Sequence, residues 1–403
     1  MTRTPRILHL HSTFDAGGKE LRNARLINAW GSAADHAIVS GDPDKRSAAH
    51  RIDKGRRIIW PKFPPLTGKP YPARLKALAA AMAGYDLICT YNWGAIDAVM
   101  AHTLFADVYK LAPLVHHEDG FNEDEADGLK WRRNLYRRIA LGRSAALVVP
   151  SKTLERIALE VWQQPRTRVR LIPNGIDTRA FAGKPRRDLL PGLIKHRDEH
   201  WIGTLAGLRK VKQLEVLIRA MAVLPPEWQL VIAGEGPERA ALLAEAERLG
   251  LEDRVHLPGF VADPAKLVGL FDIFALSSAS EQQPISVIEA MAAGLPVVAP
   301  RVGDIAAMVS SANGPWLVEP GDEKALAKAL VRLARDPEER KRVGDDNRKR
   351  ARDEFDEARM IERYRALYWG LMDRNHFQPP PSSAVHAGED RSSPNTGQTS
   401  PKD

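Results

Sequence analysis

The sequence predicts an α/β protein built from two doubly wound parallel sheets, each covered by helices on both faces. Short apolar and β-branched runs alternate with amphipathic helical stretches along most of the chain, which is the pattern of βαβ units. About a dozen such runs are too many for one open sheet of ordinary size. A basic, proline-bearing stretch over residues 183–197 separates the sixth run from the seventh. Two sheets are therefore expected.

The predicted elements follow in a regular order. Strands are expected over residues 6–11, 36–39, 86–90, 114–117, 146–150 and 168–172, and after the break over 201–205, 229–233, 255–257, 273–276, 296–299 and 316–318. Helices are expected between them, at 20–30, 74–83, 214–224, 237–249, 287–293 and 323–334 among others. Alternation of this kind predicts parallel pairing of neighbouring strands.

Turn chemistry and composition divide the chain into parts. The segment PNGIDTRAF at residues 173–181 is rich in turn formers, so we expect a first domain over 1–178 and a second over 179–356. Apolar residues at helical spacing predict a final helix over 357–375. Residues 376–403 are rich in Pro, Ser and Gly and poor in large apolar residues, which predicts a disordered tail.

Composition excludes several classes of protein. The chain has 403 residues, of which 44% are hydrophobic and 27% are charged, so it is globular. A single cysteine, Cys89, excludes a disulfide framework and a Cys-rich zinc site, and fits a reducing compartment. No apolar run reaches the roughly 20 residues of a membrane span, and His9 and His11 interrupt the first apolar stretch, unlike a signal peptide. We expect a cytoplasmic enzyme or binding protein.

Charge is distributed unevenly between the two halves. Residues 1–200 contain 33 Lys and Arg against 21 Asp and Glu, whereas residues 201–403 contain 26 against 30. A basic first half indicates an anionic partner such as nucleic acid, a phosphorylated substrate or a lipid surface. A solvated basic surface without a partner would give the same counts.

Two glycine turns follow predicted strands. Gly17 and Gly18 come after the first strand, and Gly234 and Gly236 come after the strand at 229–233, where Pro237 is expected to open a helix. Such turns let backbone N–H groups approach a phosphate at a helix N-terminus. They also occur for steric reasons alone, but one turn in each domain favours a nucleotide held between two sheets.

Charged residues of both signs follow other strands of the second half. Arg209, Lys210 and Lys212 lie in the loop after residues 201–205, where long cations could neutralise a departing diphosphate. Glu281 precedes a predicted helix, and Glu289 lies on it eight residues later. Surface loops commonly carry such residues without a function, so the significance of each charged residue depends on the motif that surrounds it.

These motifs, taken in order, resemble the retaining glycosyltransferases of family 4, the "group 1" transferases with the two-domain GT-B fold. The matching segments are GGKE at 17–20, VVPSKTLERIA at 148–158, RLIPNGID at 170–177, the Lys212 loop, AGEGPE at 233–238, LPGFV at 257–261 and the two glutamates. They cover about residues 5–375. The resemblance implies an acceptor-binding first domain, a second domain that binds a nucleotide-sugar, and a final helix that crosses back to the first.

The resemblance also implies roles for particular residues. Glu281 would lie beside the donor sugar, Glu289 would accept hydrogen bonds from the ribose hydroxyls, and Lys212 would contact the diphosphate. Gly17 and Gly18 would face the diphosphate from the first domain. The remaining donor-binding residues that it implies are Gly234, Gly236, Pro237, Ile285 and Ser286.

The chain departs from the family pattern at two places. The family usually has an arginine in a G-R-L triplet before the loop lysine, where this chain has Ala206, Gly207 and Leu208; Arg209 is the candidate replacement. The family also tends to have a histidine at the active site after the strand at 114–117, where this chain reads VHHEDG. Asp119 and His117 are both candidates for that position.

We therefore expect sugar transfer from a nucleotide-sugar to an acceptor hydroxyl, with retention of the anomeric configuration. No cofactor and no metal are expected, because no D-x-D motif stands in a suitable loop. The setting implied by resemblance is exopolysaccharide or lipopolysaccharide assembly, with a lipid-linked saccharide as acceptor. The alternatives are a nucleotide-sugar epimerase or phosphorylase on the same fold, and a nucleic-acid-binding protein, although no nucleic-acid module is recognisable.

The segment LKWRRNLYRRIALGR at 129–143 predicts a basic amphipathic helix. Trp131, Leu135 and Ile139 recur every four residues, and Tyr136 and Ala140 are expected to broaden that face. Lys130, Arg132, Arg133, Arg137 and Arg138 flank it. Such a helix suits the inner face of an anionic membrane, and an apolar stripe that faces the core would have the same sequence.

Overall fold

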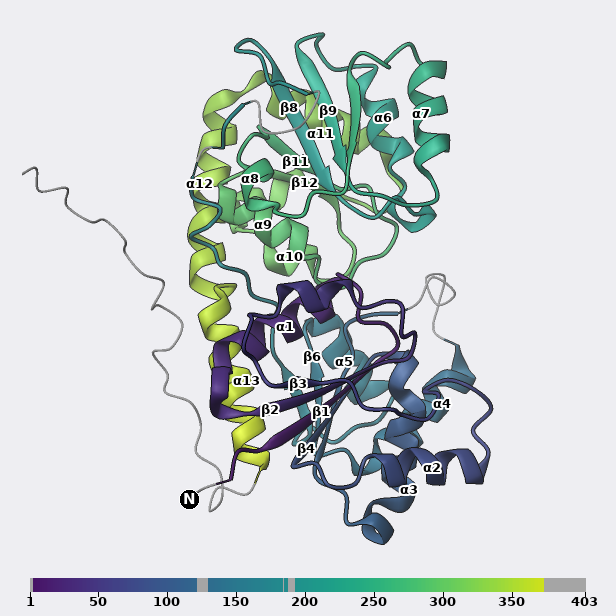
Figure 1. The fold of residues 1–403 in the computed structure, drawn as a ribbon. Helices are drawn as coiled ribbons and strands as arrows, with labels where there is room; N and C mark the ends of the chain where they lie inside the picture. Colours follow the sequence, from purple (N-terminus) through teal and green to yellow (C-terminus); the bar gives the residue numbers. More distant parts are fainter. Residues whose placement is uncertain (1–2, 122–129, 184, 188–192, 373–403) are drawn as a thin grey trace, which may run out of the picture.

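Two parallel sheets form the two halves of the computed structural model, one above the other in Figure 1. The structure describes residues 3–121, 130–183, 185–187 and 193–372, and the predicted tail at 376–403 lies outside them. The architecture confirms the expected α/β fold with two doubly wound domains. Within the described residues, no helix has both the length and the apolar character needed to cross a bilayer.

The first sheet has seven strands in the order β3-β2-β1-β4-β5-β6-β7. Its strands are β1 (Arg6–His11), β2 (Asp35–Ser40), β3 (Ile58–Ile59), β4 (Leu87–Tyr91), β5 (Leu114–His117), β6 (Ala146–Val149) and β7 (Val169–Leu171). Its helices are α1 (Gly18–Trp30), α2 (Pro72–Ala81), α3 (Ile96–Tyr109), α4 (Trp131–Ala140) and α5 (Lys152–Glu160). The two-residue edge strand β3 was not predicted.

The second sheet has six strands in the order β10-β9-β8-β11-β12-β13. Its strands are β8 (His200–Leu205), β9 (Trp228–Ala233), β10 (Val255–Gly259), β11 (Ile273–Ala275), β12 (Val297–Pro300) and β13 (Leu317–Val318). Its helices are α6 (Glu215–Met221), α7 (Arg239–Arg248), α8 (Ala265–Val268), α9 (Ile285–Ala293), α10 (Ile305–Met308), α11 (Glu323–Arg335) and α12 (Pro337–Glu354).

Both faces of the first sheet are packed with apolar side chains. Leu8 and Leu10 of β1 enter one buried cluster with residues of α2 and α3, whereas Ile7, which directly precedes Leu8, enters the opposite cluster. This alternation follows from the two-residue period of a strand. Strand order reverses at β1/β4 and at β8/β11, and such switch points are where open α/β sheets bind ligands at the carboxyl ends of their strands.

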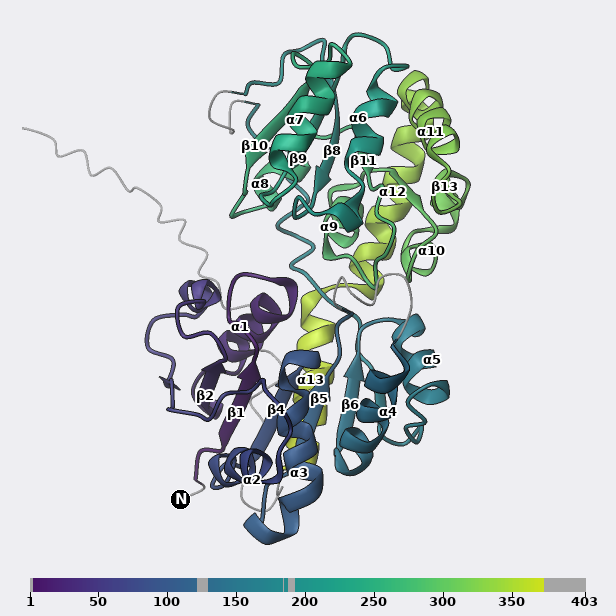
Figure 2. The same cartoon turned by 90° about the vertical axis from the view of Figure 1, so that its right-hand side faces the viewer.

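The final helix α13 (Glu357–Leu371) returns to the first domain, as expected (Figures 1 and 2). Its Tyr368 and Trp369 rings pack against Trp30 of α1, with ring centroids 5.2 and 5.1 Å away. Where the chain crosses, the Ile176 N–H donates to the Phe355 carbonyl and the Glu357 N–H donates to the Ile176 carbonyl, at 3.0 and 2.9 Å. The chain therefore passes between the domains twice, and the two connecting segments are hydrogen-bonded to each other.

Candidate active site

A cavity of about 710 Å³ lies between the two domains, at the carboxyl ends of strands from both sheets. Of the predicted site residues, its wall contains Gly17, Gly18, Asp119, Lys212, Gly234, Ile285, Ser286 and Glu289. Other polar residues of its wall are Lys19, Glu20, Asn92, Asn174, Glu235 and Gln283. The cavity therefore brings together groups from distant parts of the sequence.

The first domain contributes the N-terminal turn of α1. Gly17 is the N-cap and has no side chain with which to cap the helix, and residues 16–21 line the cavity, so the positive end of the helix dipole lies at the cavity wall. A Cβ on Gly18 would come within 3.1 Å of the Ile285 side chain on the opposite wall. Glycine at this position therefore lets the two walls approach each other closely.

The second domain contributes the loops after β8 and β9. Gly234 has a φ of +155°, and a Cβ there would lie 1.9 Å from the Ala206 carbonyl oxygen, so only glycine fits. The expectation that Pro237 opens α7 is wrong, because the helix begins at Arg239. The Glu238 N–H donates to the Leu208 carbonyl at 3.1 Å, and this bond holds residues 237–238 in a turn.

Lys212 and Glu281 form an ion pair at the edge of the cavity. The Lys212 Nζ lies 2.6 Å from the Glu281 Oε1, to which the Ser278 hydroxyl also donates at 2.8 Å. The Ser277 hydroxyl donates to the Lys212 carbonyl at 2.9 Å, which fixes the loop. A lysine held in this way presents a compact positive charge to an anion in the cavity.

Glu289 is almost fully buried on the inner side of α9 and reaches the cavity wall. Burial raises the pKa of its carboxyl group to about 7, although the positive charge of Arg25 acts in the opposite direction. No ion pair fixes this carboxyl group within the described part of the chain, and a buried carboxyl group of this kind is suited to bind hydroxyl groups of a ligand.

The structure separates the two candidates after β5. Asp119 lines the cavity, whereas His117 is buried in the sheet with both ring nitrogens bonded, one to the Thr90 carbonyl at 3.1 Å and one to the Tyr368 hydroxyl at 2.8 Å. Burial lowers the pKa of His117 to about 3. The geometry therefore favours Asp119 for contact with a substrate.

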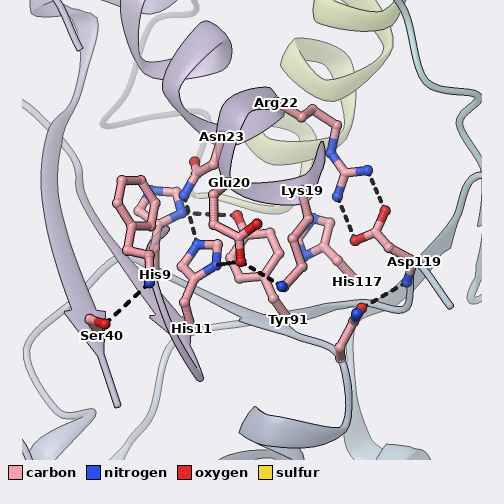
Figure 3. A network of polar contacts seen from close by, with 12 residues as sticks. His9, His11, Lys19, Glu20, Arg22, Asn23, Ser40, Tyr91, His117 and Asp119 are labelled. Atoms are coloured by element: carbon pink, nitrogen blue, oxygen red, sulfur yellow. Dashed lines mark hydrogen bonds and ion pairs between the residues drawn. The ribbon is translucent and has the colours of Figure 1, made fainter. Parts of the chain in front are cut away.

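Arg22 of α1 holds the Asp119 carboxylate through both oxygens, as Figure 3 shows. Burial alone would raise the pKa of Asp119, but the charge and hydrogen bonds of Arg22 outweigh it, so the pKa is lowered. Arg22 also donates to the Asn174 side-chain oxygen at 3.0 Å. Asp119 is thus a fixed anion that can orient a hydroxyl group.

Glu20 is a buried cavity residue to which sequence reasoning assigned no role, although it lies in the quoted GGKE turn. Its Oε1 lies 2.5 Å from the Lys19 Nζ and 3.9 Å from the His11 Nδ1 (Figure 3). Burial raises its pKa despite Lys19. Its neighbours in space could not be read from its position in the first turn of a helix.

The other predicted residues do not belong to the cavity wall, and Glu281 is among them, since it reaches the cavity only through its contact with Lys212. Arg209 is exposed, and neither it nor Gly236 or Pro237 belongs to the residues that line the cavity. Among the residues that the structure describes, no three His, Cys, Asp or Glu side chains are grouped so as to hold a metal ion.

Hydrogen bonds join the domains around the cavity. The Asn174 N–H donates to the Gln283 side-chain oxygen at 2.6 Å. The Asp304 carboxylate accepts from the Lys152 and Thr153 N–H groups at the start of α5, at 2.5 and 3.0 Å. Asp304 thereby caps a helix of the other domain.

Two families match successive parts of the chain. Residues 16–180 match the family described as Glycosyltransferase Family 4, and residues 190–350 match Glycosyl transferases group 1. N-acetyl-alpha-D-glucosaminyl L-malate synthase of Bacillus anthracis is 26% identical over 349 residues, which are 84% of this chain and 90% of that protein.

Solved structures show the same fold at low sequence identity. HepE of Anabaena, in complex with UDP and glucose, superposes with a TM-score of 0.74 at 22% identity, over 91% of this chain and all of that one. Sucrose-phosphate synthase of Thermosynechococcus elongatus has a TM-score of 0.71 at 24% identity, over 91% of this chain and 99% of that one.

Proposed function

The chain belongs to the group 1 glycosyltransferases, and from that premise we propose that it transfers a sugar from a nucleotide-sugar to an acceptor hydroxyl with retention of configuration. The observation that carries the proposal is the position of the Lys212–Glu281 pair in the second domain, at a cavity whose other wall is the N-terminus of α1. The HepE structures with UDP and with UDP-glucose support a uridine nucleotide as the first donor to test.

Three groups of residues around the cavity would bind the three parts of the donor, which are the diphosphate, the ribose and the sugar. The diphosphate would lie between Lys212 and the N–H groups that follow Gly17, which together offset its negative charge. Glu289 would accept hydrogen bonds from the ribose hydroxyls. Glu281 would hold the sugar and orient Lys212 rather than attack the anomeric carbon.

The transfer would take place on one face of the sugar. The bond between the anomeric carbon and the phosphate oxygen breaks, and the acceptor oxygen forms its bond on the same face. The acceptor proton passes to the oxygen of the leaving diphosphate, whose charge Lys212 neutralises. Asp119, fixed by Arg22, would orient the acceptor hydroxyl. Because Lys212 and a helix N-terminus would meet the diphosphate, we expect no divalent metal to be required.

The acceptor we propose is a lipid-linked saccharide in polysaccharide or lipopolysaccharide assembly, met at the inner face of the cell membrane. The basic first domain, which would bind it, favours an anionic, diphosphate-linked acceptor. The name of the Bacillus anthracis relative specifies L-malate, so small hydroxy acids belong among the acceptors tested.

A donor panel read out by release of nucleoside diphosphate tests the proposal. We expect release from one UDP- or GDP-sugar that depends on acceptor, survives excess EDTA, and yields a product whose anomeric coupling matches that of the donor by NMR. Conversion of the donor without acceptor would instead indicate an epimerase. Phosphate-dependent cleavage would indicate a phosphorylase, and inactivation by EDTA with rescue by Mg²⁺ or Mn²⁺ would overturn metal independence.

A further inference from the structure

Helix α4 presents its large apolar side chains to solvent. Trp131, Leu135 and Ile139 follow one another at four-residue spacing and are 68%, 49% and 51% exposed. A core-facing stripe, the alternative that the sequence allowed, is therefore wrong for these three residues. Single exposed apolar residues are common, but three on one short helix form a continuous apolar strip.

The opposite side of α4 makes the contacts with the domain. Arg137 is completely buried, with its guanidinium 4.8 Å from the centre of the Trp93 ring and 3.3 Å from the Glu118 carboxylate. Ala140 is also buried, and the Tyr136 hydroxyl donates to Asp97 of α3 at 2.7 Å. The expectation that Tyr136 and Ala140 broaden the exposed strip is wrong, because these residues pack against α3.

Helix α3 extends the exposed surface. Its Leu104 and Val108 are 53% and 69% exposed, and α3 lies beside α4 on the same side of the first domain (Figures 1 and 2). The Thr103 hydroxyl, next to Leu104, donates to the Ala140 carbonyl of α4. We call the surface formed by Leu104, Val108, Trp131, Leu135 and Ile139 the α3–α4 face.

All charged side chains of α4 are positive. That helix contains four arginines and no acidic residue. Arg133 and Arg137 turn inward and stack on Trp93, whereas Arg132 and Arg138 are exposed beside the apolar strip. Apolar side chains with cations beside them match the boundary between acyl chains and anionic headgroups.

We propose that the α3–α4 face rests on the surface of an anionic lipid bilayer. The face is close to the acceptor side of the cavity, because Trp93, on which Arg133 stacks at 4.9 Å, follows the cavity residue Asn92 directly. Asn92 in turn accepts a hydrogen bond from the Asp119 N–H at 2.8 Å. That a lipid-linked acceptor reaches the cavity from this surface rests on the proposed function; binding to the bilayer does not.

Co-sedimentation of the full chain with vesicles tests the face directly. We expect the protein to pellet with vesicles of phosphatidylcholine and phosphatidylglycerol and to remain in the supernatant with phosphatidylcholine alone. Leu135→Ser/Ile139→Ser and Arg132→Ser/Arg138→Ser should each weaken binding about tenfold or more. All four side chains are exposed, so the variants should fold, and an unchanged thermal transition checks this.

Matched pairs in the second domain serve as controls. Val223→Ser/Leu243→Ser removes two exposed apolar residues and Lys324→Ser/Lys328→Ser removes two exposed cations, and both variants should bind vesicles like the wild type. Failure of the wild type to pellet, equal pelleting with neutral vesicles, or wild-type binding by both face variants would overturn the proposal.

Transfer to a water-soluble acceptor separates this proposal from the proposed function. The face variants should keep wild-type rates of nucleotide release with such an acceptor, because their side chains lie outside the cavity wall. Loss of vesicle binding with unchanged release supports the membrane face. Absence of release from every donor would refute the proposed function and leave the vesicle result standing.

Discussion

The side-chain oxygen of Gln283, in the second domain, accepts a hydrogen bond of 2.6 Å from the backbone N–H of Asn174, in the first. Gln283 lies two residues from Glu281, and the Asn174 side chain accepts from Arg22, which holds Asp119. This chain of contacts connects the proposed sugar-binding carboxylate with the proposed acceptor-binding carboxylate. The contact between the domains therefore holds both sides of the site in one arrangement.

Gln283→Ala should uncouple the two sides. Loss of the bond to Asn174 removes about 1 kcal/mol from the closed arrangement, so kcat should fall about three- to tenfold, and slow hydrolysis of the donor should rise relative to transfer. Steady-state kinetics and the hydrolysis-to-transfer ratio measure this. Gln282→Ala is the matched comparison and should have a smaller effect, because its side-chain oxygen accepts only a longer hydrogen bond, of 3.4 Å, from the Ser151 hydroxyl of the first domain. A ratio unchanged in both variants would rule out the coupling.

Replacing the two members of the ion pair should have different effects. Glu281→Ala should lower turnover by orders of magnitude while nucleoside diphosphate still binds, because the sugar loses its contact and the diphosphate keeps Lys212. Lys212→Ala should weaken diphosphate binding and also lower turnover. Calorimetric titration with the product nucleotide, beside kcat, separates the two. Wild-type turnover of Glu281→Ala would remove that residue from the site.

Buried histidines should make the fold sensitive to acid. Burial lowers the pKa of His36 to about 3, and His9, whose Nε2 lies 3.0 Å from the His36 Nδ1, is also shifted well below its usual value. Below pH 6.5 the unfolded chain then binds more protons than the folded chain, so stability decreases as the pH is lowered, by roughly 1 kcal/mol per such histidine between pH 7.5 and 5.5. Urea midpoints at both values measure this, and His36→Asn should reduce the loss.

The parts of the fold that the sequence predicted are those with local signals. The apolar runs of β1 and β5 have the predicted limits, since their patterns are continuous. The contact between Asn174 and Gln283 joins residues 109 positions apart, and no local pattern contains it. For α4, periodicity showed which residues share a side but not which side is buried. The buried side of α4 is the side of Arg137, a charged residue whose place in the interior the periodicity did not indicate.

Glu289→Gln should stabilise the protein and weaken nucleotide binding at the same time. The carboxyl group has a usual pKa of 4.5 and a folded value of about 7, so the folded state binds more protons in that interval and stability falls as pH rises through it. At pH 8 the amide should add roughly 3 kcal/mol to the free energy of unfolding, and at pH 4.5 almost nothing. A carboxylate that accepts from the ribose hydroxyls binds best when ionised, so nucleotide affinity of the wild type should rise from pH 6 to pH 8. The variant should bind about tenfold more weakly at pH 8, with no such rise. Urea unfolding and calorimetric titration at three pH values test both effects. Equal nucleotide affinity in the two proteins at pH 8 would show that the burial of Glu289 serves packing alone.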